Sequence, residues 1–189
     1  DIALMEELNR ALDIAAREES AKLLMITAAG EKVFSAGVDV MDHTPDKVVQ
    51  MIDVFHGILK RLMVFPLPTV AALNGSAMGG GCELALACDM AVASEDARIG
   101  QPEIKLGVFP PIAAILMPRI ISLPKVMELL LGGGLISAQE ALHLVRVRQR
   151  GRVQQLDRRR RAVAQVDRLV HLTHAAAADE HAELERADH

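Results

Sequence analysis

Two acids and a run of glycines are the residues whose types and spacing could do chemistry. Gly79 to Gly81 precede a predicted apolar helix that carries Glu83 in its first turn, and Glu103 follows twenty positions later. Glycine costs about 0.5–1 kcal/mol against alanine inside a helix, so three together require a turn or a closely approaching ligand. Unpaired N–H groups at a helix start can hold an anionic oxygen. The pattern indicates oxyanion stabilisation beside carboxyl groups that move protons.

Each feature also has a plain structural interpretation. A second triplet, Gly132 to Gly134, precedes the Ser137–Glu140 pattern of a capping box and is interpreted as a turn between helices. Alone, Glu83 could stabilise a helix N-terminus and Glu103 could begin a turn in water. A phosphate loop or dinucleotide fingerprint is disfavoured, because the glycines lack the following Lys-Ser or Lys-Thr and the required spacing. The glycines and both acids together favour catalysis.

Three segments must position these residues, and each is expected to be a tight turn after a strand. They are FSAGVDV (34–40), GGGCE (79–83) and GQPEIKLG (100–107). The ends of neighbouring strands in α/β folds form the crevice where ligands bind. The sequence therefore predicts that the three turns share one site.

The surrounding pattern predicts an α/β fold. Short apolar runs over 21–30, 69–73 and 90–94 are typical of buried parallel strands. Apolar residues at helical spacing predict amphipathic helices over 2–17 and 46–63. Strands that alternate with helices indicate this fold class.

Composition excludes some functions. A net charge of -4, no Trp, no Tyr and four Phe argue against nucleic-acid binding. Prolines interrupt the most apolar stretch, and no secretion signal opens the chain, so neither a membrane span nor export is expected.

Cys82 and Cys88 are expected on one helix, about 240° apart, and therefore unpaired. A cytoplasmic location is predicted.

The composition changes near residue 146. Residues 146–189 hold ten of the fifteen arginines, whereas no lysine follows Lys125 and no proline follows Pro124. We therefore divide the chain into a core over 1–145 and an Arg-rich tail over 146–189. The tail is interpreted either as a polar helix or disordered segment with a solvated basic face, or as an out-of-frame reading of the coding DNA.

Three motifs in order resemble those of the enoyl-CoA hydratase/isomerase family, the crotonase superfamily. They are FSAGVD (34–39), NGSAMGGGCELALACDMAVAS (74–94) and ARIGQPEIKLGVFP (97–110). The resemblance covers residues 1–145 and implies a spiral of repeated ββα units that binds acyl-CoA thioesters as homotrimers or dimers of trimers. The strands that the family has before its first helix, and its C-terminal helices, are not recognisable here.

The resemblance implies roles by position. The backbone N–H groups of Val38 and Gly80 would hold the thioester oxygen, and Glu83 and Glu103 would be the catalytic carboxyl pair. Hydration needs a base for the water and an acid for the alpha carbon. We expect Glu103 to be the donor to carbon, although the residues leave this assignment open. No metal or separate cofactor is implied, because coenzyme A is part of the substrate.

Further residues are candidates for the pocket. Substrate contacts are expected from Ala36, Asp39, Gly79, Phe109 and Pro110, and a CoA phosphate contact from Lys32. Plainer alternatives are a solvated Lys32 and an Asp39 that caps the following turn.

Three more side chains receive a structural interpretation. Cys82 is expected to be a small buried filler, His56 to pack on its helix and His43 to lie at most on the pocket rim.

Two glutamates favour hydration, because relatives that lack one act as isomerases, decarboxylases or dehalogenases. SAGVDVMDHTPDKV (35–48) resembles dienoyl-CoA hydratases of anaerobic aromatic degradation, and GVFPPIAAILMP (107–118) departs from the glycine-rich run of ordinary hydratases. Cyclohexa-1,5-diene-1-carbonyl-CoA is therefore the substrate we expect. The alternatives are a double-bond isomerase, a ring-opening oxo-acyl-CoA hydrolase and a catalytically silent binding or assembly subunit.

Overall fold

The computed structural model describes the backbone of residues 1–150 and the side chains of residues 1–145. Residues Asp1–Arg146 form one compact unit. Apart from the end of the last described helix, the Arg-rich tail lies outside the described residues, so both interpretations of it stay untested. No helix in the described part is long and apolar enough to cross a membrane.

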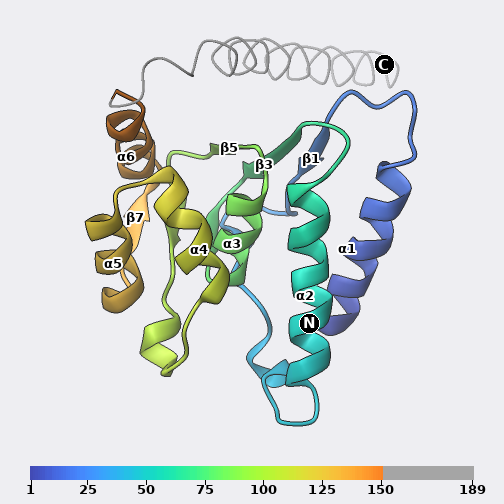
Figure 1. Ribbon diagram of the computed structural model, residues 1–189, viewed down its shortest axis with the longest axis horizontal. Helices are drawn as coiled ribbons and strands as arrows, with labels where there is room; N and C mark the ends of the chain where they lie inside the picture. The colour runs from blue at the N-terminus through green and yellow to red at the C-terminus, as the bar shows by residue number, and fades with distance from the viewer. Residues whose placement is uncertain (151–189) are drawn as a thin grey trace, which may run out of the picture. The chain divides into compact units, whose positions relative to one another are not determined.

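Helices and short strands alternate along this unit (Figure 1). The helices are α1 (Ile2–Ala15), α2 (Val48–Met63), α3 (Gly80–Ala87), α4 (Pro111–Ile120), α5 (Leu123–Gly132) and α6 (Ala138–Arg150). The strands are β1 (Leu24–Ile26), β2 (Val33–Ser35), β3 (Thr69–Leu73), β4 (Ser76–Met78), β5 (Met90–Ala93), β6 (Arg98–Gly100) and β7 (Leu135–Ser137). Short 3-10 helices, η1 (Val40–Asp42) and η2 (Glu103–Leu106), follow β2 and β6.

Successive strands enter two sheets in turn. One sheet has the order β1-β3-β5 and is parallel, and the other has the order β2-β4-β6-β7, in which β7 alone is antiparallel to its neighbour. A helix follows each pair of strands, so β1-β2-α2, β3-β4-α3 and β5-β6-α4 are three turns of one spiral. The predicted α/β spiral of ββα units is confirmed.

Burial differs among the strands that the sequence predicted to be buried. Val70 and Ala71 of β3 are fully buried, because β3 has a strand on each side. Met25 of β1 and Val92 of β5 are 44% and 45% exposed. The prediction of three buried strands is therefore wrong for β1 and β5, since each is an outer strand with a neighbour on one edge only.

The two predicted amphipathic helices are confirmed as α1 and α2, which lie side by side in Figure 1. They share one apolar cluster with parts of α3 and α4. Its buried members are Met5, Leu12, Met51, Ile58, Leu59, Leu62, Ala87 and Leu116. This cluster fixes the α1–α2 pair beside the sheets and so limits where the turn between β2 and α2 can lie.

The second glycine triplet has the structural role that was predicted. Gly133 ends α5 with a φ of 61°, and the short strand β7 separates it from α6. The Ser137 hydroxyl oxygen accepts the Glu140 N–H at 3.1 Å, as a helix cap does.

Thr69 and Asp89 join the starts of β3 and β5. One Asp89 carboxylate oxygen accepts both the Thr69 N–H and its hydroxyl at 2.9 Å, and the Asp89 N–H donates to the Thr69 hydroxyl oxygen at 2.8 Å. Thr69 is fully buried. The contacts therefore set the register of β3 and β5, which are neighbours in one sheet.

We predict that Thr69→Val lowers the free energy of unfolding by about 1–3 kcal/mol, because it removes the buried hydroxyl that accepts the Asp89 N–H and donates to the Asp89 carboxylate. Urea unfolding measures the effect. The matched control is Thr27→Val, which changes an exposed threonine just after β1. Equal unfolding midpoints for the two variants would contradict the prediction.

Candidate active site

The three predicted turns follow neighbouring strands of one sheet. β2, β4 and β6 are adjacent and parallel, so their carboxyl ends lie at the same edge. Residues 36–39 follow β2, Gly79 and Gly80 follow β4, and residues 101–106 follow β6. This strand order brings the three turns to one edge of the sheet.

Two backbone amides from different turns are unpaired and adjacent. Neither the Val38 N–H nor the Gly80 N–H has an acceptor within the residues that the structure describes. A Cβ placed on Gly80 would lie 3.4 Å from the Val38 nitrogen, and one placed on Gly37 would lie 3.1 Å from the Gly80 nitrogen. The two amide nitrogens therefore lie close together, each on a different turn.

The first glycine triplet allows this close approach. Gly79 has a φ of +55°, and a Cβ there would lie 2.7 Å from Glu103 Oε1. A Cβ on Gly81 would overlap the Ser35 carbonyl oxygen. In the second triplet, by contrast, Gly132 and Gly134 face open space. Gly81 is thus required by a backbone contact between elements, and Gly79 by its left-handed backbone conformation.

Glu83 is a buried acid held at the start of α4. Its side chain is in the first turn of α3, the residue is 5% exposed, and Oε1 accepts the Ala113 N–H at 2.9 Å. Burial raises the pKa of Glu83, and the charge of Glu103 raises this pKa further. The backbone amides of Ala113 and Ile112 lower it. The balance favours a carboxyl group that exchanges a proton more readily near neutral pH than a solvated one.

Glu103 is half-buried at the first position of η2, and burial raises its pKa too. The side-chain amide nitrogen of Gln101 is turned toward the Glu103 carboxylate. It donates to Oε1 at 2.9 Å and to Oε2 at 3.0 Å. Gln101 is fully buried. These bonds orient Glu103 over Gly79, so its structural interpretation as an acid in water does not hold.

The two glutamates lie near each other, since the charge of Glu103 raises the pKa of Glu83. Cys82 lies against them and Gln101. Burial, followed by the charge of Glu83, raises the pKa of the Cys82 thiol to about 12. Because this thiol is buried and free, it acts as the filler that was expected.

Gln101 was not singled out from the sequence. A single glutamine between Gly100 and Pro102 has no periodic signal. Its position two residues before an acid, in an apolar context, was the available clue.

Ala36 and Asp39 lie in the turn after β2. The Ala36 carbonyl oxygen is 3.9 Å from the Cβ position of Gly79. Asp39 Oδ1 accepts the Met41 N–H at 2.9 Å, which is the capping role that was the alternative interpretation. Pro110 is buried directly before α4.

Phe109 and Lys32 are exposed. Lys32 precedes β2, at the other end of this strand from the turn with the Val38 amide, so the structure does not bring it to the glutamates. Its contact with a CoA phosphate stays a prediction. His43 is exposed, with Nδ1 3.0 Å from the Asp39 carbonyl oxygen, and His56 is half-buried within α2.

Comparisons with known proteins agree with this geometry. A sequence profile described as "Enoyl-CoA hydratase/isomerase" matches residues 1–185. A probable enoyl-CoA hydratase of Bacillus subtilis (strain 168) is 36% identical over 146 residues, which are 75% of this chain and 56% of that protein. The cyclohexa-1,5-dienecarbonyl-CoA hydratase of Thauera aromatica is 35% identical over 140 residues, 74% of this chain and 54% of that protein. The chain thus spans about half the length of the curated relatives it matches.

Solved structures show the same fold. The crystal structure of an enoyl-CoA hydratase from Bacillus anthracis has a TM-score of 0.73 at 35% identity, over 76% of this chain and 57% of that chain. Human enoyl coenzyme A hydratase domain-containing protein 3 has a TM-score of 0.71 at 29% identity, over 76% and 58% of the two chains. Because the profile covers most of the sequence and the spiral agrees with solved relatives, this chain belongs to the enoyl-CoA hydratase/isomerase family.

Proposed function

We propose that the protein adds water across the conjugated double bond of an unsaturated acyl-CoA thioester. One observation carries the proposal: the unpaired amides of Val38 and Gly80 lie together at the strand ends that also hold Glu83 and Glu103. Attack of water on such a substrate places negative charge on the thioester oxygen. Two fixed donors favour this charge over the neutral carbonyl, which speeds the reaction more than it strengthens binding.

The glutamates supply the proton transfers. One carboxylate takes a proton from the attacking water and the other carboxyl delivers a proton to the alpha carbon, so the pair needs two protonation states at once. Burial of both groups and the repulsion between them favour a state with one shared charge. We assign proton delivery to Glu103, because its orientation by Gln101 and its position over Gly79 bring it beside the Gly80 amide.

For the acyl group we propose cyclohexa-1,5-diene-1-carbonyl-CoA. Support comes from the resemblance of residues 35–48 and from the Thauera aromatica relative at 35% identity. The Bacillus subtilis relative, at 36%, is equally similar, so product analysis with linear enoyl-CoA and cyclic dienoyl-CoA thioesters must separate the two substrate classes. Assembly as homotrimers or dimers of trimers in the cytoplasm belongs to the same proposal.

We predict that Glu83→Gln and Glu103→Gln each lower kcat for hydration at least about a hundredfold, because each removes a group that transfers a proton. Acyl-CoA affinity, measured by calorimetry with a saturated thioester, should change little. The matched control is Glu95→Gln, an exposed acid after β5.

The readout is the mass gain of one water in the product. Undiminished turnover in either glutamine variant would contradict the roles of the glutamates. A product with a moved double bond and no added water would replace hydration by isomerisation, and a ring-opened product would indicate the hydrolase.

We also predict a bell-shaped pH profile of kcat/KM. The base must be ionised and the acid protonated, and burial raises the pKa of both carboxyl groups above the ordinary value of 4.5. Activity should therefore fall on the acid side while the pH is still above 4.5. The circular dichroism spectrum at each pH verifies that the fold persists. A rate that stays constant from neutral pH down to 4.5 would count against raised pKa values.

A further inference from the structure

The segment after Val38 has little apolar burial to hold it. Among the described residues 39–47, Asp42 alone is classed as buried, at 6% exposed. Val40 and Met41, the apolar side chains of η1, are 67% and 73% exposed. A segment with so few buried apolar contacts opens easily unless polar contacts fix it.

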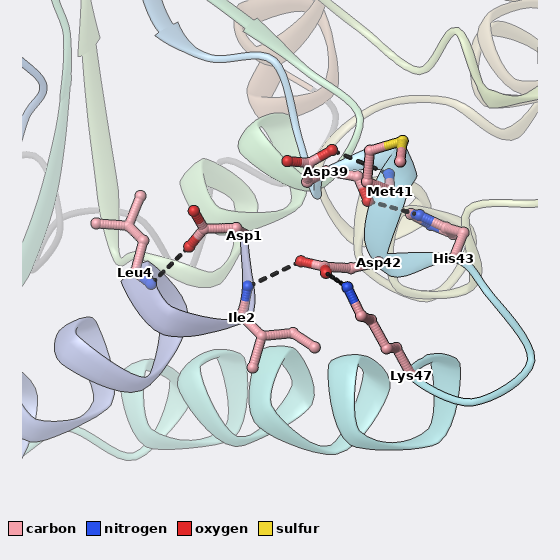
Figure 2. A network of polar contacts seen from close by, with 8 residues as sticks. All are labelled: Asp1, Ile2, Leu4, Asp39, Met41, Asp42, His43 and Lys47. Carbon is pink, nitrogen blue, oxygen red and sulfur yellow. Dashed lines mark hydrogen bonds and ion pairs between the residues drawn. The ribbon is translucent and has the colours of Figure 1, made fainter.

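The Asp42 carboxylate joins this segment to two helices, as Figure 2 shows. One oxygen, Oδ2, accepts the N–H of Ile2, the first residue of α1, at 2.9 Å. The other, Oδ1, pairs with Nζ of Lys47, directly before α2, at 3.4 Å. Both contacts suit a negative charge, because the Ile2 N–H lies at the positive dipole end of α1 and Lys47 Nζ is a cation.

A short hydrogen-bonded path leads from Asp42 back to Asp39, the residue after Val38. The Asp39 carbonyl oxygen accepts the Asp42 N–H at 3.0 Å, and Asp39 Oδ1 accepts the Met41 N–H at 2.9 Å. These bonds make residues 39–42 one tight turn, and Val38 is the residue before it. Movement of Asp42 therefore shifts Asp39, which is bonded covalently to Val38.

We infer that Asp42 is a positioning residue, which fixes the turn that presents the Val38 amide to the thioester oxygen. The inference rests on the proposed function of this amide and adds the anchor on which its position depends. Asp42 itself does not touch the substrate. It acts from the far side of the turn, through η1, on the alignment of one of the two donors.

Hydrogen exchange tests the anchoring without any substrate. In Asp42→Ala, exchange of the Met41 and His43 amides, which are bonded within η1, should become at least about tenfold faster. The matched control is Asp13→Ala, because Asp13 pairs with Arg61 at 3.0 Å and so also joins α1 to α2, away from the turn. Exchange in η1 should stay unchanged in the control. Equal exchange in Asp42→Ala and the wild type would overturn the inference.

A milder variant covers the case in which Asp42→Ala does not fold. Lys47→Met removes one of the two Asp42 contacts and leaves the bond to the Ile2 N–H. It should accelerate exchange at Met41 and His43 by a few-fold. Wild-type exchange in this variant, together with an unfolded Asp42→Ala, would mean that Asp42 supports the fold as a whole and would overturn the positioning role.

The effect of Asp42 on the Val38 amide is measured by the absorbance of bound 3-oxobutanoyl-CoA. The enolate of this thioester absorbs in the near ultraviolet. Donors at the thioester oxygen stabilise the enolate, so the wild type should raise this absorbance on binding. In Asp42→Ala the band should weaken and kcat should fall about 10- to 100-fold, while KM changes less than about threefold. A wild-type band in a variant with fast exchange would overturn the positioning role.

The failure of this inference differs from that of the proposed function. A wild type that hydrates no thioester, but forms the enolate band and loses it in Asp42→Ala, refutes hydration and supports the anchor. A wild type that hydrates, with an Asp42→Ala variant that keeps slow exchange and full kcat, supports hydration and refutes the anchor.

Discussion

The site depends on the close approach of two stretches of backbone, the turn after β2 and the start of α3. A side chain at Gly81 would overlap Ser35, and one at Gly80 would press on Phe55 and Val38, so α3 can begin here only without side chains at these positions. This contact places two N–H groups from separate turns side by side, and neither has an acceptor within the described residues. Val38 and Gly80 are both partly buried, and an N–H group without a protein acceptor is free to donate to a polar ligand.

The burial of two acids beside these amides is the second constraint. Like charges in a partly dry site raise each other's pKa, and the fold limits the cost by giving each carboxylate a donor. Glu83 receives the N–H at the start of α4, and Glu103 receives the side-chain amide of Gln101. The same contacts fix where the carboxyl groups point. The bonds that offset burial therefore also orient the two groups to which we assign proton transfer.

Patterns that repeat within one element were predictable from the sequence, and contacts between elements were not. Apolar spacing located α1 and α2 to within two residues, and the glycine turns and both acids were recognised as one set. The strands β2, β4 and β6 have three residues each, too few for a periodic signal, so the second sheet was visible only through its turns. The Glu83 bond to Ala113 spans 30 positions. Asp42 binds Ile2 across 40 positions, and nothing in the local sequence marks this pair.

The central claim is that the Val38 and Gly80 amides hold one thioester oxygen. The most direct measurement is the infrared C=O stretch of an acyl-CoA with a ¹³C-labelled thioester carbonyl, free and bound at saturation. Two aligned donors should lower the stretching frequency on binding, because they draw electron density onto oxygen. A saturated complex whose carbonyl frequency equals that of the free thioester in water would contradict the account.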